Sequence, residues 1–197
     1  MSKATAWALA GLFLVAGCAS PPPPRALVII PSTPAVPVAG PEAPASTSVG
    51  IALAPLRLPE HWQRRQVLHL RQGAELVAWP DAVWAERVET GMTRRLSQAL
   101  RQRAPELGWW TGDDALSPRR LLVDVQQLDV RADPGDIVAT VSWRLVDRQG
   151  RVLDGGSLSN HLQAPIGSAQ QEAQALAQWL DTQAEALALR LRGPLPR

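Results

Sequence analysis

The sequence predicts an α+β domain in which two amphipathic helices pack on one face of a mostly antiparallel sheet. Residues 81–103 and 168–193 carry apolar side chains at helical spacing, which predicts the two helices. Between them, residues 121–162 alternate apolar and polar positions and are interrupted by turn sequences, the pattern of an antiparallel meander. Earlier in the chain, two apolar runs, 66–71 and 75–79, flank a Gln-Gly turn and predict a hairpin.

The elements before the first helix are short. Residues 25–30 form a β-branched run between two proline-rich stretches. Such a run would promote aggregation if it were exposed, so we expect it to return to the sheet as a first strand. Residues 49–56 predict a second strand that ends near Pro55. Asp81 is expected to cap the first helix, and residues 107–110 predict a further short strand after it.

The meander and the second helix have clear local signals. The alternation over 121–130 slips at Gln126-Gln127, which predicts a β-bulge, since one extra residue reverses the facing of every later side chain. The strands 137–147 and 151–162 follow, each after a turn. Ser168 is expected to cap the second helix, with Gln171 three residues later as in a capping box.

The amino end of the chain has the pattern of an export signal. A positive residue, Lys3, precedes an apolar run over 4–15 that is too short to span a bilayer. Val15-Ala16-Gly17-Cys18 follows and resembles the lipobox of bacterial lipoproteins. The resemblance implies that Cys18 is lipidated and that the chain is cleaved after Gly17. The alternative is an ordinary secretory signal with an accidental cysteine.

These features divide the chain into a signal peptide (1–17), a lipidated proline-rich tether (18–24), one α+β domain (25–193) and a short tail (194–197). The domain includes a proline-rich loop over 31–48. Ala19 follows the lipobox cysteine where inner-membrane lipoproteins of the enterobacterial type have Asp. The resemblance therefore implies an anchor in the outer membrane, with the domain on its periplasmic face.

Composition and side-chain chemistry exclude several functions. Lys3 is the only lysine, and the remaining 19 basic residues, all arginine, nearly balance 18 acidic ones, so nucleic-acid binding is not expected. Cys18 is the only cysteine, so intramolecular disulfides are not expected either. The three histidines (His61, His69 and His161) lie in no hydrolase or zinc-binding motif. We therefore expect no enzymatic activity, no cofactor and no metal site.

Two motifs of residues 49–100 point to a family. Leu58-Pro59 follows the second predicted strand, and Trp84-Ala85-Glu86 lies near the start of the first predicted helix. The stretch resembles the ABC-type transport auxiliary lipoproteins of the paraquat-inducible C (PqiC) type, although Val83, Arg87 and Val88 replace the family's Arg, Pro and Leu. The resemblance implies an auxiliary subunit that docks an MCE-domain protein in an intermembrane lipid transport system. Two alternatives are a stand-alone lipid- or glycan-binding lipoprotein and an assembly factor of another envelope complex.

Four residues are candidates for contact with a partner. Arg87, Arg94 and Arg101 recur every seven positions and should form one line on the first predicted helix, opposite its apolar stripe. Trp62 follows Leu58-Pro59 in a predicted loop. The alternative for the arginines is a solvated helix face, and for the tryptophan a place in the core. This interpretation allows three partner interactions: with a membrane through Cys18, with an MCE-domain protein, and with further copies of the chain in a homo-oligomer.

Overall fold

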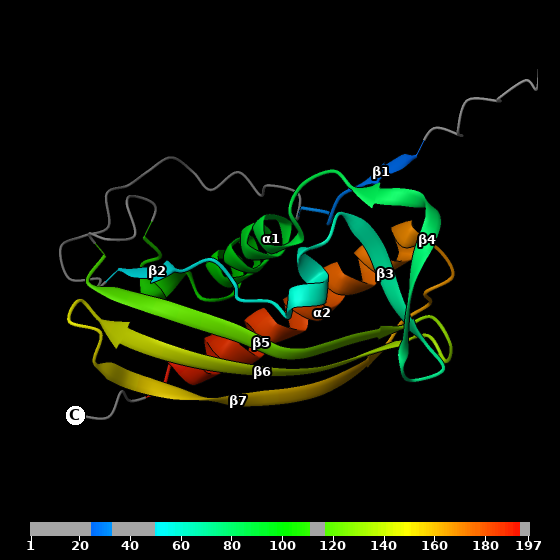
Figure 1. The fold of residues 1–197 in the computed structure, drawn as a ribbon. Coiled ribbons are helices and arrows are strands. Elements are labelled where there is room, and N and C mark those ends of the chain that lie inside the picture. The colour runs from blue at the N-terminus through cyan, green and yellow to red at the C-terminus, as the bar shows by residue number, and fades with distance from the viewer. Residues whose placement is uncertain (1–24, 33–49, 111–116, 194–197) are drawn as a thin grey trace, which may run out of the picture.

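The computed structural model describes residues 25–32, 50–110 and 117–193. A seven-stranded, mostly antiparallel sheet carries two helices on one face, which confirms the predicted fold class (Figure 1). The strands are β1 (Ala26–Val28), β2 (Ile51–Leu53), β3 (Gln66–Arg71), β4 (Glu75–Trp84), β5 (Arg119–Arg131), β6 (Asp136–Asp147) and β7 (Val152–Gln163). The helices are α1 (Val88–Arg103) and α2 (Ala169–Leu191), with short 3-10 helices η1 (Glu60–Gln63) and η2 (Pro105–Leu107).

The three long strands β5, β6 and β7 form the predicted meander. Their register shifts between Val125 and Gln127, which confirms the predicted bulge at Gln126-Gln127. Along β6 the side chains of Ala139, Val141 and Trp143 are buried in the core, while those between them face away from the helices. This alternation gives the meander one apolar face, on which the helices pack.

Helix α2 begins at the predicted cap. The Ser168 hydroxyl accepts a hydrogen bond from the backbone N–H of Gln171 at 3.2 Å, and the Gln171 side chain accepts one from the N–H of Gly167. The Gln171 N–H is one of the groups that the first turn of a helix leaves without a helical partner, and Gly167 lies directly before the cap. Arg95 of α1 forms two hydrogen bonds, 3.0 and 2.5 Å long, with Asp181 of α2, so an ion pair joins the two helices.

The predicted start of the first helix is wrong. Asp81 is not a helix cap, because β4 continues to Trp84 and α1 starts only at Val88. The end of β4 pairs in parallel with β1, Ala26 to Ala82 and Val28 to Trp84, and the run 25–30 therefore does return to the sheet as expected. Trp84 and Val88 are both buried and lie four positions apart, which is the spacing of an apolar helix stripe. Only Val88 belongs to the helix.

The predicted strand over 107–110 is also largely absent. Leu107 ends η2, and one isolated bridge, between Ile51 and Trp109, is the strand-like pairing in this stretch. The Trp109 indole instead donates a hydrogen bond to the backbone oxygen of Ala104 at 2.8 Å. That contact folds the segment back onto the end of α1.

The outer edge of β5 is covered by two different strands with a gap between them. Strand β2 pairs with the beginning of β5, at Arg119 to Leu121, whereas β3 reaches β5 only at its end, where Leu70 faces Arg131. Residues 54–65 cross the gap. Within it, the backbone of Arg57 bonds to Val123 and Val125, and the Trp62 indole donates to the backbone oxygen of Leu128 at 3.1 Å. The crossing segment thus supplies hydrogen bonds that a neighbouring strand would otherwise make.

Candidate functional site

A hollowed surface surrounds the segment Leu53–Leu58, which lies between α1 and β5. Three adjoining hollows of about 270, 340 and 400 Å³ border it. Arg87 and Glu89 border the first and third, and Arg57 and Glu89 border the first and second. We call this region the Arg57 surface; its members are Pro55, Arg57, Leu58, Arg87, Glu89, Arg94, Arg120 and Arg144.

The segment is held on both sides. On the α1 side, the Thr93 hydroxyl accepts a hydrogen bond from the N–H of Leu56 at 3.0 Å and donates one to the backbone oxygen of Glu89. On the sheet side, the backbone of Arg57 bonds to β5 in both directions. Leu56 is buried and Arg57 is exposed, as alternation along an extended segment requires. The Arg57 side chain is therefore presented to solvent by a fixed backbone.

The Arg57 surface has an excess of positive charge. Arg57, Arg87 and Arg144 are exposed, and Arg120 is half-buried. Glu89 accepts a hydrogen bond from Arg87 at 2.8 Å, and Asp124 borders one hollow. Arginine forms two parallel hydrogen bonds with a carboxylate or phosphate and loses its hydration more readily than lysine. A surface of this kind fits an acidic segment of a partner.

The structure brings Arg87 and Arg94 together but does not place the three predicted arginines on one exposed helix line. Arg87 precedes α1 and has an extended backbone. Arg94 lies on α1 and makes two hydrogen bonds, 2.7 and 2.6 Å long, with Glu86; this contact raises the pKa of Arg94. Arg101 donates to the backbone oxygen of Trp110 at 3.0 Å, and burial lowers the pKa of its guanidinium. Arg101 is therefore half-buried and fixes the chain after η2, so it does not lie on one exposed line with Arg87 and Arg94.

Trp62 is a core residue and not an exposed contact. Only 4% of its surface is accessible, and its indole N–H bonds to the backbone of β5. It lies beneath the same hollow that Arg87 borders, so it supports the Arg57 surface from below. The prediction that Trp62 itself touches a partner is corrected accordingly.

Sequence reasoning missed Arg57, Arg120 and Arg144. They come from three separate elements: the crossing segment, β5 and β6. No regular spacing in the sequence indicates that these residues lie together. Arg120 and Arg144 reach the same hollow only through the register of β5 and β6. The signal that could have been used is Arg57 itself, a charged residue between Leu56 and Leu58 and two positions before Pro59.

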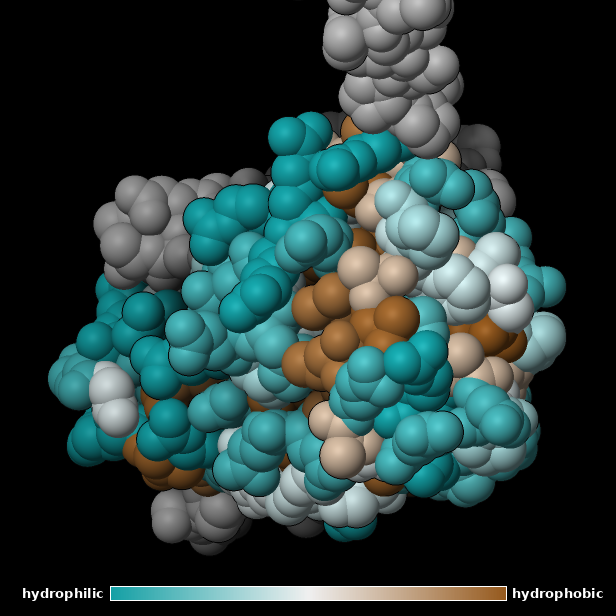
Figure 2. All heavy atoms as spheres, turned by 45° about the vertical axis from the view of Figure 1, so that its right-hand side comes forward, coloured by the Kyte–Doolittle hydropathy of each residue, from teal (hydrophilic) through white to brown (hydrophobic). Residues whose placement is uncertain are grey.

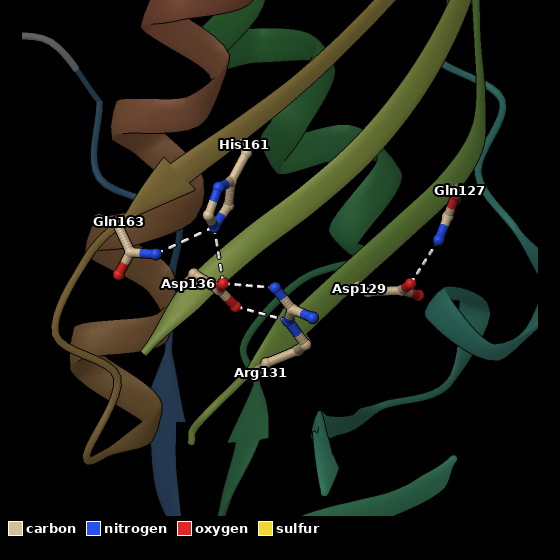
Figure 3. A network of polar contacts seen from close by, with 6 residues as sticks. All are labelled: Gln127, Asp129, Arg131, Asp136, His161 and Gln163. Atoms are coloured by element: carbon tan, nitrogen blue, oxygen red, sulfur yellow. Dashed lines mark hydrogen bonds and ion pairs between the residues drawn. The ribbon is translucent and has the colours of Figure 1, made fainter. Parts of the chain in front are cut away.

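A polar network lies at one end of the meander (Figure 3). Asp136, which is 1% exposed, accepts hydrogen bonds from both Arg131 on β5 and His161 on β7, the latter at 2.7 Å. The hydrogen bond from Arg131 lowers the pKa of Asp136, so the carboxylate stays ionised. Gln163 contacts His161 at 3.0 Å, and Gln127 donates to Asp129 nearby. The network ties three strands together.

A second polar group is buried where α2 meets the hairpin of β3 and β4. The Trp79 indole donates to Glu172 at 2.7 Å, and the His69 ring lies 4.4 Å from the Trp79 ring, centroid to centroid. Burial raises the pKa of Glu172 to about 8 and lowers the pKa of His69. Both groups are therefore neutral near pH 7, which is the state that a buried position favours.

The described parts of the chain hold no cluster of three or more His, Cys, Asp or Glu side chains that could bind a metal ion. His61 lies on η1, His69 in the core and His161 on the open face of the sheet. Within residues 25–32, 50–110 and 117–193, no helix is long and apolar enough to cross a membrane. Cys18 lies outside the described residues.

Two helices lie on one face of a curved sheet, and an exposed basic surface borders α1 and β5. The sequence matches the family of ABC-type transport auxiliary lipoprotein components over residues 32–188. The chain belongs to this family, as the resemblance in its sequence implied. An enzyme is not indicated by this membership.

Solved structures support the fold. An uncharacterized protein of known crystal structure is 16% identical, with a TM-score of 0.64, and the match covers 85% of this chain and 99% of that one. Protein XCC0632 from Xanthomonas campestris is 17% identical, with a TM-score of 0.60, and the match covers 83% and 93% of the two chains. No curated protein matches the sequence.

Proposed function

We propose that the chain is a lipid-anchored auxiliary subunit of an intermembrane lipid transport system. It is anchored through Cys18 in the outer membrane, on the periplasmic face, and docks an MCE-domain protein through the Arg57 surface. The family is a transport auxiliary lipoprotein family, which supports the general role. The observation that carries the docking step is the Arg57 surface, where a segment bonded to both α1 and β5 presents Arg57 beside the exposed Arg87 and Arg144.

Replacing Cys18 by alanine is expected to abolish lipidation and release the chain from the membrane fraction. The thiol is the group that receives the diacylglyceryl unit, and two or three acyl chains are needed for stable anchoring. Labelling cells with a radioactive fatty acid, followed by fractionation, measures both effects. A Cys18→Ala protein that still takes up label and sediments with the outer membrane would contradict the anchor. Ala19→Asp is the companion variant, and it is expected to move the protein to the inner membrane in a host that sorts by Asp.

Reversing the charge of Arg57 and Arg87 together is expected to weaken binding to the MCE-domain protein by at least about tenfold, since each reversal replaces an attraction to an acidic partner by a repulsion. Both side chains are exposed, and the Arg87 side chain is 77% accessible, so the free energy of unfolding should change by roughly 0–1 kcal/mol for each. Arg94 is kept, because it makes two hydrogen bonds with the half-buried Glu86, whereas Arg87 makes one hydrogen bond with Glu89 from an exposed position. Co-purification and a binding titration with an MCE-domain protein of the same organism measure the effect.

Arg190→Glu is the matched control, because Arg190 is an exposed arginine near the end of α2, away from the Arg57 surface. It should leave binding unchanged. Equal binding by the wild type, the Arg57→Glu/Arg87→Glu protein and the control would remove the Arg57 surface from the interface.

A further inference from the structure

The hairpin of β3 and β4 and the adjoining β1 share an exposed apolar surface. Its exposed members are Leu27, Ile29 and Leu76, which are 66%, 52% and 46% accessible. Leu68, Leu70 and Ala78 are half-buried beside them. We call this set the apolar hairpin face. Figure 2 shows hydrophobic side chains gathered over this part of the molecule and bordered by hydrophilic ones.

Strand register places these side chains on one side of the sheet. Leu68 pairs with Ala78 and Leu70 with Leu76, and paired residues of adjacent strands point to the same face. Leu27 pairs with Val83 of β4, which is 7% accessible and pairs in turn with Gln66 of β3. The β3–β4 register shifts between Gln66 and Leu68, but these two residues are two positions apart on β3 and so face the same side. The residues between, such as Val67 and Val28, point into the core. The apolar hairpin face is therefore the side of these strands that faces away from the helices.

Apolar side chains that are exposed together mark an interaction site more often than scattered ones do. The other exposed large apolar residues among those described, Val152 and Leu189, lie on β7 and near the end of α2. Neither belongs to this face.

Charge and chain length identify the occupant. Arg25, Arg64 and Arg65 are exposed at the β1 end of the face and outnumber the exposed carboxylates close to them in sequence, Glu60 and Asp81. At the hairpin end, Arg71 and Glu75 form an exposed ion pair that adds no net charge. Exposed arginines beside apolar residues fit the boundary between anionic lipid headgroups and acyl chains. Cys18 is seven positions before Arg25, so the chain between them spans at most about 25 Å even when fully extended. An anchor at Cys18 would thus keep β1 close to the lipid surface.

We infer that the apolar hairpin face lies against the membrane to which the chain is anchored, with Leu27, Ile29 and Leu76 in contact with lipid. The inference rests on the proposed lipidation of Cys18. It fixes the orientation of the domain: the hairpin lies on the lipid surface, and the end of α2 that carries Leu189 points away from it.

The test uses the full lipidated chain with one introduced cysteine that carries an environment-sensitive fluorophore. Cys18 is the only native cysteine and is consumed by lipidation, so each introduced cysteine is the one free thiol. Leu27→Cys and Leu76→Cys report on the face, and Leu189→Cys is the matched control, since it replaces a leucine that is 70% accessible. The proteins are reconstituted in vesicles of phosphatidylethanolamine with a quarter phosphatidylglycerol, with and without nitroxide-labelled lipid. Thermal midpoints confirm that each variant is folded.

We expect nitroxide lipid to quench the labels at positions 27 and 76 at least about twofold more than the label at 189, with emission shifted to the blue. Vesicle-bound protein with equal quenching at all three positions would overturn the inference and leave the anchor intact. A blue shift without quenching by nitroxide lipid would also overturn it, because the face would then be covered by protein. A mature chain without acyl mass would overturn the anchor and the inference together.

Discussion

Replacing Glu172 by glutamine is expected to stabilise the protein at pH 8 and to remove most of the pH dependence of its stability between about pH 5 and 8. Glu172 is 0% exposed, and burial raises its pKa from 4.5 to about 8. Its folded-state pKa is thus above its unfolded-state pKa. Between these two values the unfolded chain releases the proton while the folded chain keeps it, so the free energy of unfolding falls as pH rises.

The size of this effect follows from the shift. Each unit of pKa corresponds to about 1.4 kcal/mol, which gives a loss of about 3 to 5 kcal/mol across the interval. Glutamine is neutral at every pH, and its side-chain oxygen can still accept the hydrogen bond from Trp79. It should therefore keep the contact between α2 and the hairpin without the cost of a buried charge.

Chemical denaturation at a series of pH values measures this prediction. Glu185→Gln is the matched control, because Glu185 lies on the same helix and is exposed. It should reproduce the pH profile of the wild type. If Glu172→Gln instead follows the wild-type profile, or is less stable than the wild type at pH 8, Glu172 is not held neutral in the folded protein.

Replacing Trp62 by alanine is expected to destabilise the fold by about 3 to 5 kcal/mol, the range found when a large buried aromatic side chain is removed. The indole fills the space between the crossing segment and β5 and satisfies the backbone oxygen of Leu128. Trp62→Phe keeps most of the volume and loses the hydrogen bond, so it should cost about 1 kcal/mol. The two variants separate the packing contribution from the polar one.

Gln63→Ala is the control for this pair, because Gln63 is the exposed neighbour on η1 and should change stability little. Denaturation midpoints at one pH are sufficient. A Trp62→Ala protein as stable as Gln63→Ala would contradict the assignment of Trp62 to the core. Weaker partner binding by a fully stable Trp62→Phe protein would restore the earlier prediction of a direct contact.

The elements with local signals were predictable from the sequence. The bulge at Gln126-Gln127 is visible as a change in alternation, and the cap at Ser168 as a side chain that can accept the N–H of Gln171. The start of α1 was not predictable in this way. Ala82 to Trp84 form a strand because β1, more than 50 residues earlier, pairs with them, and a helical pattern of apolar residues cannot reveal such a partner.

The same distinction applies to the candidate site. Arg87 and Arg94 were found because they are close in sequence, and they do border one hollow. Arg101, which was expected to lie on the same line, donates a hydrogen bond to the backbone oxygen of Trp110 instead. A spacing of seven residues cannot indicate this contact. Arg57 and Arg144 join the surface through the crossing segment and the register of the meander, and both depend on tertiary structure. The Arg57 surface therefore depends on the tertiary structure and could not be predicted from the sequence.

The central claim is that the Arg57 surface docks an MCE-domain protein. Site-specific photocrosslinking in intact cells tests it most directly, with a photoreactive amino acid in place of Arg57 and, as a control, in place of Arg190. We expect a covalent adduct from position 57 that contains an MCE-domain protein, and no such adduct from position 190. A fully anchored, folded protein that gives no adduct at position 57, or gives the same adduct at both positions, would contradict it.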